Sequence, residues 1–520
     1  MKKTSKVVYK PYEMNQPQLL PPSLEELIPE KHMVRVVNKV IDQMDLSMVE
    51  QGYKGGGTSS YHPKMLLKVL VYAYTEQIYS GRRIAKAVRE NIAFMWIAGR
   101  NRPDFRTINR FRSERLKGKI QAVFTEVLKY LIKTKHIKYE HYFVDGTKIE
   151  ANANRYSYVW KKSTDKQRMN LEEKVKELFK KIDEINKAEE EEYGAKDLEE
   201  LGEDSEIDSR DIEALSDRLD KILNEDPKDK EIKKAQKLVE TDYLPRMKRY
   251  EQYEQTFGGR NSFSKNEHDA TFMRMKEDHI GNRTMKPGYN VQIGTEDQMI
   301  VGFSIHQNPS DSPTLIPHLQ KLKHNLGKIP PVLVADAGYG SEENFLVLEA
   351  EGITPYVKYS SFDKENKKRR KITDKEKYSI QQFTYDENSD SFLCPENKRL
   401  FYKKNEYEKS ATGYISEKRV YHCPDCDGCK AREICTSSKD GRSIRFSPTL
   451  ARLRKSAFER LNSGVGKKLR SRRSADVEAV FGLLKGNRKF RRFHLRGLEK
   501  VEVEWGLLSI AHNLSKIAAM

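Results

Sequence analysis

Apolar residues recur at helical spacing along the first part of the chain, which predicts a helical domain over residues 1–135. The stretch "PKMLLKVLVYAY" begins at Pro63, a residue that suits the first position of a helix, and carries a broad apolar face. Three shorter helical segments follow at 80–91, 92–99 and 102–116. Short helices with brief breaks are typical of a compact helical module, and relatives of the helix-turn-helix are modules of this kind.

The last of these segments combines a predicted cap, a core face and a group of arginines. Asp104 is suited to cap the helix, and Ile108 and Phe111 are suited to face the core. The candidates for contact with DNA phosphates or bases are Arg106, Arg110 and Arg112. The alternative is that these arginines form a solvated surface, because their spacing alone does not distinguish the two roles.

Residues 160–284 are predicted to be a charged coiled-coil insertion with its linker. Apolar residues alternate there at spacings of four and three in two stretches, the pattern of an antiparallel helical hairpin or coiled coil. The first set is Leu171, Val175, Leu178, Ile182 and Ile185, and the second is Ile212, Leu215, Leu219 and Ile222. The connection between them, residues 187–210, is strongly acidic and is predicted to be solvated surface.

Strand patterns lie on both sides of that insertion. Residues 136–159 contain one apolar strand, and residues 285–358 contain a hairpin with the turn "DQ", a capped helix, the strand "PPVLVADAGYG", a second helix and another strand. A basic, cysteine-rich insertion is predicted over 359–447, followed by C-terminal helices over 448–520. With both insertions removed, the order of elements predicts an α/β fold, a mixed sheet flanked by helices in the order of an RNase-H-like domain.

Two of the apolar strands lead into an aspartate that is followed by small residues. "YFVDGT" places Asp145 in this position, and "VLVADAGYG" places Asp336 there. An ionised aspartate is rarely buried without a partner. Because ligands bind at strand ends in mixed α/β sheets, the two aspartates are candidates to hold a divalent metal between them.

The C-terminal helix "DVEAVFGLLK" offers Glu478 as a third carboxylate, and the competitors for that place are Asp476, Glu499 and Glu504. Three carboxylates suit two Mg²⁺ ions about 3.5–4 Å apart, which stabilise the attacking and the leaving oxygen of a phosphodiester. Each residue also has an ordinary alternative. An Asp after a strand is often a turn former or a helix cap, and a Glu on an amphipathic helix usually faces solvent.

The charge of the chain points to a polyanionic partner. The formal net charge is +19 and the isoelectric point is near 9.3, which favours nucleic acid over an anionic membrane surface, the ribosome or an ordinary basic enzyme. The N-terminal stretch lacks the apolar core of a signal peptide, and no stretch approaches the roughly 20 apolar residues of a membrane span. We therefore expect a cytoplasmic protein that does not enter a membrane.

All five cysteines lie between residues 394 and 435, which favours a local metal site over a scattered disulfide framework. Four follow the spacing C-x2-C-x2-C-x5-C, namely Cys423, Cys426, Cys429 and Cys435, and Cys394 precedes them. We expect structural Zn²⁺ on those four thiolates. An iron–sulfur cluster and no metal at all are the alternatives, and nothing nearby suggests the base that a catalytic thiol needs.

Several stretches resemble the DDE-type transposases of bacterial insertion sequences. They are "YFVDGTKIEAN", "KPGYNVQIGTE", "VADAGYG" and "VEAVFGLLKGNRKFRRFHLRGLEKVEVEWGLLSIAHNLSK". The N-terminal "YHPKMLLKVLVYAYTEQIYSGRRIAKAVREN" and "FMWIAGRNRPDFRTINRFR" resemble the helical N-terminal domain of the same family. The resemblance covers nearly the whole chain and is greatest to the insertion-sequence group numbered eleven-eighty-two.

The resemblance implies an RNase-H-like catalytic core whose acidic triad binds Mg²⁺ or Mn²⁺. Carried over residue by residue, that triad falls on Asp145, Asp336 and Glu478. In related families a lysine seven residues after the glutamate helps to hold DNA, and Lys485 matches it.

One part of the family pattern does not fit this chain. Related families place a Tyr and an Arg before the glutamate, with the Arg four residues before it, whereas this chain has Ser471 and Ser474 at those positions. Arg472 and Arg473 lie nearby but out of register. The arginine position of the family is therefore not matched by spacing in this segment.

We therefore expect a DNA transposase that cuts at the ends of its element by metal-assisted attack of water and joins the freed 3′-hydroxyls to target DNA. Its partners are double-stranded DNA, at the terminal inverted repeats and at the target, and a second copy of the chain, with the N-terminal domain reading the ends. We expect it to be nucleoid-associated. The alternatives are an RNase-H-like nuclease that does not join strands, a catalytically silent DNA-binding protein derived from a transposase, and a metal-binding scaffold or RNA-binding protein.

Overall fold

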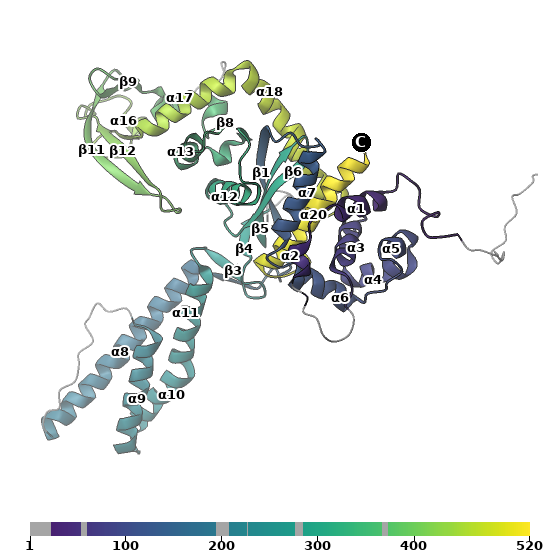
Figure 1. Cartoon of the computed structure of the whole chain (residues 1–520). Coiled ribbons are helices and arrows are strands. Elements are labelled where there is room, and N and C mark those ends of the chain that lie inside the picture. Colours follow the sequence, from purple (N-terminus) through teal and green to yellow (C-terminus); the bar gives the residue numbers. More distant parts are fainter. Residues whose placement is uncertain are drawn as a thin grey trace, which may run out of the picture. The chain divides into compact units, whose positions relative to one another are not determined.

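A computed structural model of the chain describes residues 22–51, 53, 60–193, 207–225, 227–275, 284–366 and 373–520 (Figure 1). For 183–193 and 374–375 the backbone alone is described. The chain divides into two compact units, Met1–Tyr130 with Leu507–Met520, and Leu131–Gly506. Within the described residues, no helix is both long enough and apolar enough to cross a membrane.

The first unit is helical, as predicted. Its helices are α1 (Met33–Asp42), α2 (Ser47–Glu50), α3 (Pro63–Thr75), α4 (Gly81–Glu90), α5 (Ile92–Ile97), α6 (Phe105–Arg110), a π-helical turn (Phe111–Arg115) and most of α7 (Ile120–Lys133). Asp104 caps α6 by accepting a hydrogen bond from the backbone N–H of Thr107. Ile108 and Phe111 are buried. The predicted cap and core face of this segment are therefore confirmed.

The second unit is built around a mixed sheet of six strands. They are β1 (His141–Glu150), β4 (Thr271–Arg274), β5 (Met285–Glu296), β6 (Met299–His306), β7 (Val332–Ala335) and β8 (Thr354–Val357). The order is β4-β5-β1-β7-β8, with β6 also paired to β5. β5 is antiparallel to β1, β4 and β6, whereas β7 is parallel to both β1 and β8. The prediction of a mixed α/β fold is confirmed.

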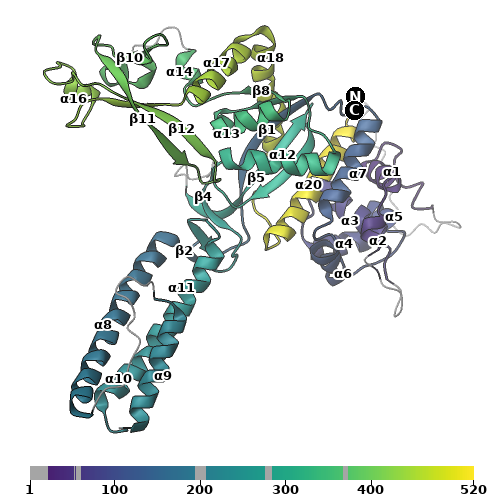
Figure 2. The ribbon, with the colours of Figure 1, turned by 60° about the vertical axis from the view of Figure 1, so that its left-hand side comes forward.

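Short connections and helices join these strands. Asp297 and Gln298 form the tight turn between β5 and β6, and both have positive φ, at 53° and 63°, as a two-residue hairpin turn requires. The connections onward are the 3-10 turns Ser312–Thr314 and Ala337–Tyr339 and the helices α12 (Leu315–Leu326) and α13 (Glu342–Ala350). Both helices lie beside the sheet in two views (Figures 1 and 2).

The C-terminal helical run is less regular than its sequence predicts. It consists of α17 (Pro448–Asn462), α18 (Gly464–Arg473), a π-helical turn (Ser474–Glu478), α19 (Ala479–Gly482), a second π-helical turn (Leu483–Asn487) and α20 (Leu498–Ala518). The predicted helix around Glu478 therefore contains two π-helical turns. A π-helical turn bonds residues five apart, so it changes which side chains share a face.

The charged insertion is a helical bundle set on a two-stranded ribbon of β2 (Tyr158–Trp160) and β3 (Ser262–Ser264). Its helices are α8 (Lys161–Tyr193), α9 (Ser209–Glu225), α10 (Lys230–Leu238), a π-helical turn (Val239–Tyr243) and α11 (Leu244–Phe257). The predicted apolar positions of α8 and α9 form its core: Leu171, Val175, Ile182, Ile212, Leu215 and Leu219 are buried, with Leu178 and Ile222 packed against them. The predicted apolar positions of α8 and α9 thus pack into one core, and α10 and α11 add helices that the two heptad sets did not predict. The side chain of Ile185 and residues 194–206 of the acidic connection lie outside the described part.

The cysteine-rich insertion contains an antiparallel sheet of its own. Its strands are β9 (Thr384–Asp386), β10 (Ser391–Leu393), β11 (Arg399–Lys409), β12 (Ile415–His422) and β13 (Ser443–Phe446), in the order β13-β12-β11-β10-β9. The short helical pieces of this region are α14 (Phe362–Glu365), α15 (Asp374–Lys377), the 3-10 turn Ile380–Gln382 and α16 (Arg432–Cys435). The predicted basic run "KENKKRRK" falls largely on residues outside the described part.

Candidate active site

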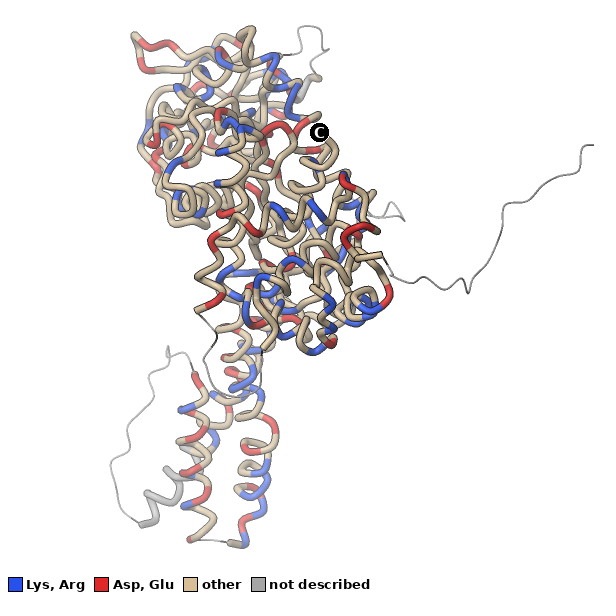
Figure 3. The backbone as a smooth tube through the Cα atoms, turned by 45° about the vertical axis from the view of Figure 1, so that its right-hand side comes forward, with Lys and Arg blue, Asp and Glu red and all other residues tan. Residues whose placement is uncertain are grey.

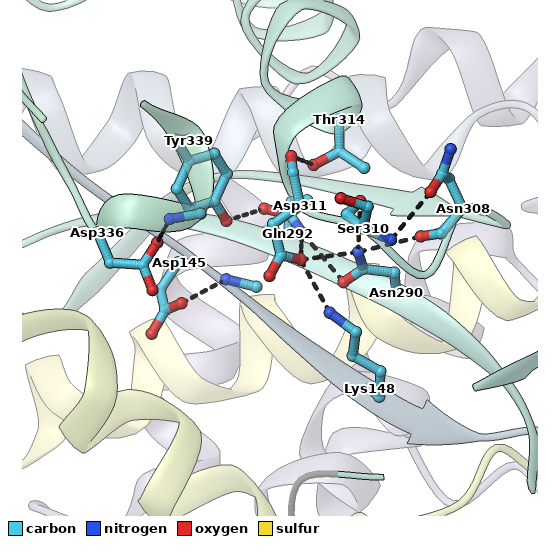
Figure 4. Close-up of polar contacts among 12 residues, drawn as sticks. Asp145, Lys148, Asn290, Gln292, Asn308, Ser310, Asp311, Thr314, Asp336 and Tyr339 are labelled. Atoms are coloured by element: carbon cyan, nitrogen blue, oxygen red, sulfur yellow. Dashed lines mark hydrogen bonds and ion pairs between the residues drawn. The ribbon is translucent and has the colours of Figure 1, made fainter. Parts of the chain in front are cut away.

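Asp145 and Asp336 lie on adjacent parallel strands. Phe143 of β1 pairs with Val334 of β7, and each aspartate stands two residues further along its own strand direction. Residues two apart on a strand point to the same face, so the two aspartates continue one register on one face of the sheet. Figure 4 shows their carboxyl groups close together.

The strand around Asp145 differs from the prediction in one respect. Asp336 directly follows the last residue of β7, as predicted, whereas β1 continues from Asp145 to Glu150. Asp145 is therefore inside a strand and is 8% exposed. It can carry a charge there because β7 pairs only with residues 141–143, which ends the parallel pairing before Asp145.

Gly146 is required by the side chains that pack against β1. A Cβ atom at this position would lie 2.2 Å from Nε2 of Gln292 and 2.7 Å from Oδ1 of Asp311. Real Cβ atoms essentially never approach other atoms so closely. The "DG" of the sequence thus reflects crowding beside Asp145, since Gly146 itself lies in a regular strand.

A buried polar network supports the two aspartates (Figure 4). Oδ1 of Asp311 accepts hydrogen bonds from Nζ of Lys148 at 2.9 Å, from Nδ2 of Asn290 at 2.8 Å and from Nε2 of Gln292 at 3.1 Å. The hydroxyl of Tyr339 donates to Oε1 of Gln292. Asn290, Gln292 and Tyr339 are completely buried, so the network holds β1, β5 and the segment after β7 in a fixed relation.

The pKa of Tyr339 depends on the charged groups that surround the site. Burial raises the pKa of its hydroxyl well above the ordinary value, the carboxylates of Asp311, Asp145 and Asp336 raise it further, and Arg473 lowers it. The hydroxyl therefore keeps its proton and acts as a donor. Its surroundings place three carboxylates and one guanidinium around the same point.

Glu478 is brought to this site by Arg473. Nη2 of Arg473 lies 2.5 Å from Oε1 of Glu478, and Nη1 of the same guanidinium lies 3.5 Å from Oδ2 of Asp145. Ser474 Oγ also donates to Glu478 Oε2 at 2.9 Å. One guanidinium thus joins carboxylates from β1 and from the C-terminal helical run.

The π-helical turn Ser474–Glu478 explains why spacing did not predict this arginine. Arg473 precedes Glu478 by five residues, which is out of register in an α-helix but in register across a π-helical turn. The departure from the family spacing therefore does not prevent Arg473 from contacting Glu478. Arg472 turns elsewhere and pairs with Asp297 and Asp476.

Two of the competitors of Glu478 have structural roles. Asp476 is buried and accepts hydrogen bonds from Oγ1 of Thr295 at 2.7 Å and from the backbone N–H groups of Asp297 and Gln298, both at 3.0 Å. Glu504 is completely buried and accepts from the N–H groups of His494 and Leu495. Glu499 is exposed in the first turn of α20.

Of the four residues predicted to contact DNA, two are buried and two are exposed. Arg112 is 3% exposed and donates to the carbonyl of Tyr79 at 2.6 Å and to the hydroxyl of Tyr74 at 3.2 Å, so it is a core residue and the prediction that it reaches DNA is wrong. Lys485 is also buried, so its predicted DNA contact gains no support. Arg106 and Arg110 are exposed on α6.

The donor atoms of the carboxylate site are all oxygens, the type that Mg²⁺ and Mn²⁺ prefer. Among the described residues, however, no three His, Cys, Asp or Glu side chains stand in an arrangement ready for a metal ion. At the carboxylate site the guanidinium of Arg473 contacts both Asp145 and Glu478. The oxygen donors fit a divalent cation by their chemistry.

Asp311, Tyr339 and Arg473 are site residues that sequence reasoning missed. Asp311 precedes a 3-10 turn in "NPSDSPT", which looks like an ordinary turn. Tyr339 stood within the recognised "DAGYG" without a role. A signal in the sequence was the alternation of polar Asn290 and Gln292 with apolar residues in the buried middle of β5.

The five cysteines gather around one cavity of about 20 Å³ in the second insertion, and all are free thiols. Burial raises the pKa of the Cys423 thiol to about 12, and the neighbouring thiols of Cys426 and Cys394 raise it further. The predicted convergence of the cysteines is thus present, and Cys394 takes part in it. Bound zinc stays a prediction.

Two family models match the chain. Residues 393–518 match a transposase DDE domain, and residues 22–114 match a transposase domain described as DUF772. The first match contains Glu478 and all five cysteines, whereas Asp145 and Asp336 lie outside both. A search of curated proteins finds no match. The two matches support a DDE-type transposase of an insertion sequence, an enzyme that acts on DNA.

Proposed function

We propose that this chain is the transposase of a bacterial insertion sequence of the group numbered eleven-eighty-two. It cuts the element ends by hydrolysis and joins the freed 3′-hydroxyls to target DNA. The observation that carries the proposal is the sharing of Arg473 by Asp145 and Glu478 beside Asp336, which gathers three carboxylates from distant parts of the chain.

We further propose that the mixed sheet is an RNase-H-like core. In its favour, β1 is antiparallel to β5 and β5 to β6, with the bundle and the short strand β4 inserted between β1 and β5, and the parallel strands β7 and β8 follow through helices. The centre of the sheet is then the boundary between its antiparallel and parallel halves. Asp145 and Asp336 stand at that boundary.

Asp145, Asp336 and Glu478 would hold Mg²⁺ or Mn²⁺. When bound, two such ions supply an activated nucleophile and neutralise charge on the attacking and leaving oxygens. The chain itself supplies the positioning. The backbone N–H groups of Gly146 and Gly338 hold the carboxylates of Asp145 and Asp336, and the network of Asp311, Gln292 and Tyr339 packs beside them. Arg473 contacts two of the three carboxylates and is placed to meet a phosphate once they release it.

The DNA-reading surface that we propose lies on α4 and α6, which pack against each other. The guanidinium groups of Arg82 from α4 and Arg106 from α6 both lie over the ring of Phe105, at 5.2 and 5.8 Å. The exposed cations of this basic surface are Arg82, Arg83, Lys86, Arg89, Arg106 and Arg110. Such a surface supplies the sequence-independent part of DNA binding. In the helical bundle, by contrast, Figure 3 shows acidic and basic positions interleaved, which favours a solvated surface there.

Two element ends need two active sites, so we propose a homodimer on DNA, within the nucleoid. The test uses the purified full chain, Mg²⁺ and a supercoiled plasmid that carries the DNA flanking the coding region. We expect strand-transfer products with the wild type and with Glu499→Gln, and none with Asp336→Asn or Glu478→Gln.

Each other outcome selects an alternative. Cleavage without joined strands would favour a nuclease, and unchanged DNA with the wild type would favour a silent DNA-binding protein. Loss of activity in Glu499→Gln but not in Glu478→Gln would show that the third carboxylate is wrong.

A further inference from the structure

The cavity lined by cysteines lies in the second insertion and has no part in the proposed DNA chemistry. All five cysteines line it, so a four-ligand metal site must leave one of them out. Four of the cysteines belong to the apolar core of this insertion or pack against it, and Cys429 does not. The buried members of this core are Phe383, Phe392, Leu400, Tyr421, Cys423 and Ile444, and Cys394, Cys426 and Cys435 pack against it. Cys429 lines the cavity without being part of that core.

The turn that carries Cys394 is folded around its sulfur. The backbone N–H of Lys398 donates to Sγ of Cys394 at 3.2 Å. The turn is closed by Cys394 N–H to Lys398 O at 2.8 Å and by Asn397 N–H to Cys394 O at 2.9 Å, with Asn397 at a φ of 57°. Backbone N–H groups aimed at a sulfur stabilise its anionic, metal-binding form.

A second turn presents Cys423 and Cys426 in the same manner. The N–H of Arg442 donates to Sγ of Cys426 at 3.3 Å, and the N–H of Cys423 donates to the carbonyl of Arg442 at 3.0 Å. Gly441, at a φ of 96°, allows this approach, because a Cβ there would lie 2.9 Å from the carbonyl oxygen of Cys423. Both turns thus direct N–H groups at cysteine sulfurs that line one cavity.

Cys435, at the end of α16, is the fourth cysteine of the proposed set that lines the cavity. Its side chain lines the cavity with the other cysteines and packs against the same apolar core as Cys394 and Cys426. Three basic side chains also line the cavity, those of Lys398, Arg432 and Arg442. They would offset the net negative charge of a divalent cation held by four thiolates.

We propose that Cys394, Cys423, Cys426 and Cys435 bind one structural zinc ion and that Cys429 is not a ligand. Four thiolates in tetrahedral arrangement are a closed zinc site. A cavity of about 20 Å³ has room for a single ion. The thiols line the cavity without forming a ready ligand set, so binding draws the two turns together and releases the thiol protons. This set differs from the one that spacing predicts by the exchange of Cys429 for Cys394.

The first experiment measures the metal content of the full chain purified without chelator, with Cys394→Ser and Cys429→Ser as a matched pair. We expect about one zinc per chain in the wild type and in Cys429→Ser, and loss of zinc in Cys394→Ser. Zinc lost from Cys429→Ser, or retained in Cys394→Ser, would overturn the ligand set. Stoichiometric iron with sulfide, or a wild type without metal, would overturn the zinc site itself.

A second measurement needs no substitution and so does not depend on whether Cys394→Ser folds. The native wild-type chain is treated briefly with a thiol alkylating agent, and the modified cysteines are identified by mass spectrometry. We expect modification of Cys429 and protection of the other four, with all five modified after a strong chelator removes zinc. Protection of Cys429 together with modification of Cys394 would contradict the proposal.

Discussion

The carboxylate site and the cysteine-lined cavity gather potential metal ligands by opposite routes. The carboxylates come from β1, the end of β7 and the C-terminal helical run, and the chain supplies its own cation, Arg473, between two of them. The thiols come from two turns of one small sheet, and burial raises the pKa of Cys423 to about 12, so without a metal its thiol stays neutral. The carboxylate site thus holds a cation of the chain between two of its members, whereas the zinc that we propose at the cysteines would have to come from solution.

Removal of all metal ions should give the largest difference in stability between the region of the carboxylate site and that of the cysteine-lined cavity. We expect a strong chelator to abolish DNA cleavage and also to loosen the sheet of β9–β13, because zinc on cysteine sites is worth about 10–16 kcal/mol at neutral pH. The sheet that carries Asp145 and Asp336 should keep its protection. Hydrogen–deuterium exchange measured by mass spectrometry follows both regions at once.

The control for chelation is to add back one metal ion at a time. Zn²⁺ should restore protection of β9–β13, and Mg²⁺ should then restore cleavage. Unchanged exchange in β9–β13 after complete metal removal would break the comparison, and so would opening of β1 and β7.

Gly146→Ala tests the crowding beside Asp145. Its Cβ would meet Gln292 and Asp311 at 2.2 and 2.7 Å, so we expect a loss of about 1–3 kcal/mol in the free energy of unfolding and a severe loss of cleavage. Gly482→Ala is the matched control, because nothing lies within 4 Å of its Cβ, and a helical alanine stabilises by up to about 1 kcal/mol. Urea unfolding measures both. A Gly146→Ala chain as stable and active as the wild type would refute the packing described at Asp145.

Gly441→Ala tests the approach of the chain to Cys423 and Cys426. We expect weaker retention of zinc against a competing chelator, since positive φ costs about 1–2 kcal/mol for alanine and the Cβ would also lie 2.9 Å from the carbonyl oxygen of Cys423. Gly413→Ala carries a similar φ of 91° with nothing within 4 Å. It should keep its zinc. Equal zinc retention in the two variants would show that the close approach at Gly441 is unimportant.

Arg473→Ala tests whether this guanidinium occupies the place of a metal ion. We expect Ca²⁺, a cation that allows binding to be measured without catalysis, to bind about tenfold more tightly, because a charge pair at 3.5–4 Å is worth about 1–4 kcal/mol at partly exposed sites. DNA cleavage should fall. Titration calorimetry on the DNA-free chain measures the affinity, with Arg472→Ala as the control since Arg472 pairs with Asp297 and Asp476. Weaker Ca²⁺ binding in Arg473→Ala would mean that Arg473 positions the carboxylates instead.

The sequence was informative wherever pattern and burial coincide. The strand before Asp336, the cap at Asp104 and the heptads of α8 and α9 all follow from local periodicity, and the structure contains them. The mixed sheet followed from the order of elements. Asp145 was selected correctly as a charge beside buried residues, although its strand continues past it.

The failures share one physical cause, which is that the partners of a polar side chain are not visible in local spacing. Arg112 looked like a surface cation but donates to Tyr79 and Tyr74 inside the first unit. Arg473 looked out of register because nothing in the sequence announces a π-helical turn. The role of Cys394 is not visible from its spacing, and the structure places it at the same cavity as the other four cysteines.

The most direct test of the central claim is whether Asp145, Asp336 and Glu478 bind one metal site. Fe²⁺ substituted for Mg²⁺ reacts with added hydrogen peroxide, with ascorbate to regenerate Fe²⁺, and gives hydroxyl radicals that cut the polypeptide near the bound ion. The cut positions are read by mass spectrometry. We predict cuts clustered around residues 145, 336 and 478, suppressed by Mg²⁺ and absent in Asp336→Asn. Cuts confined to the acidic helices of the bundle, or cuts near 145 and 336 that never reach 478, would contradict the account.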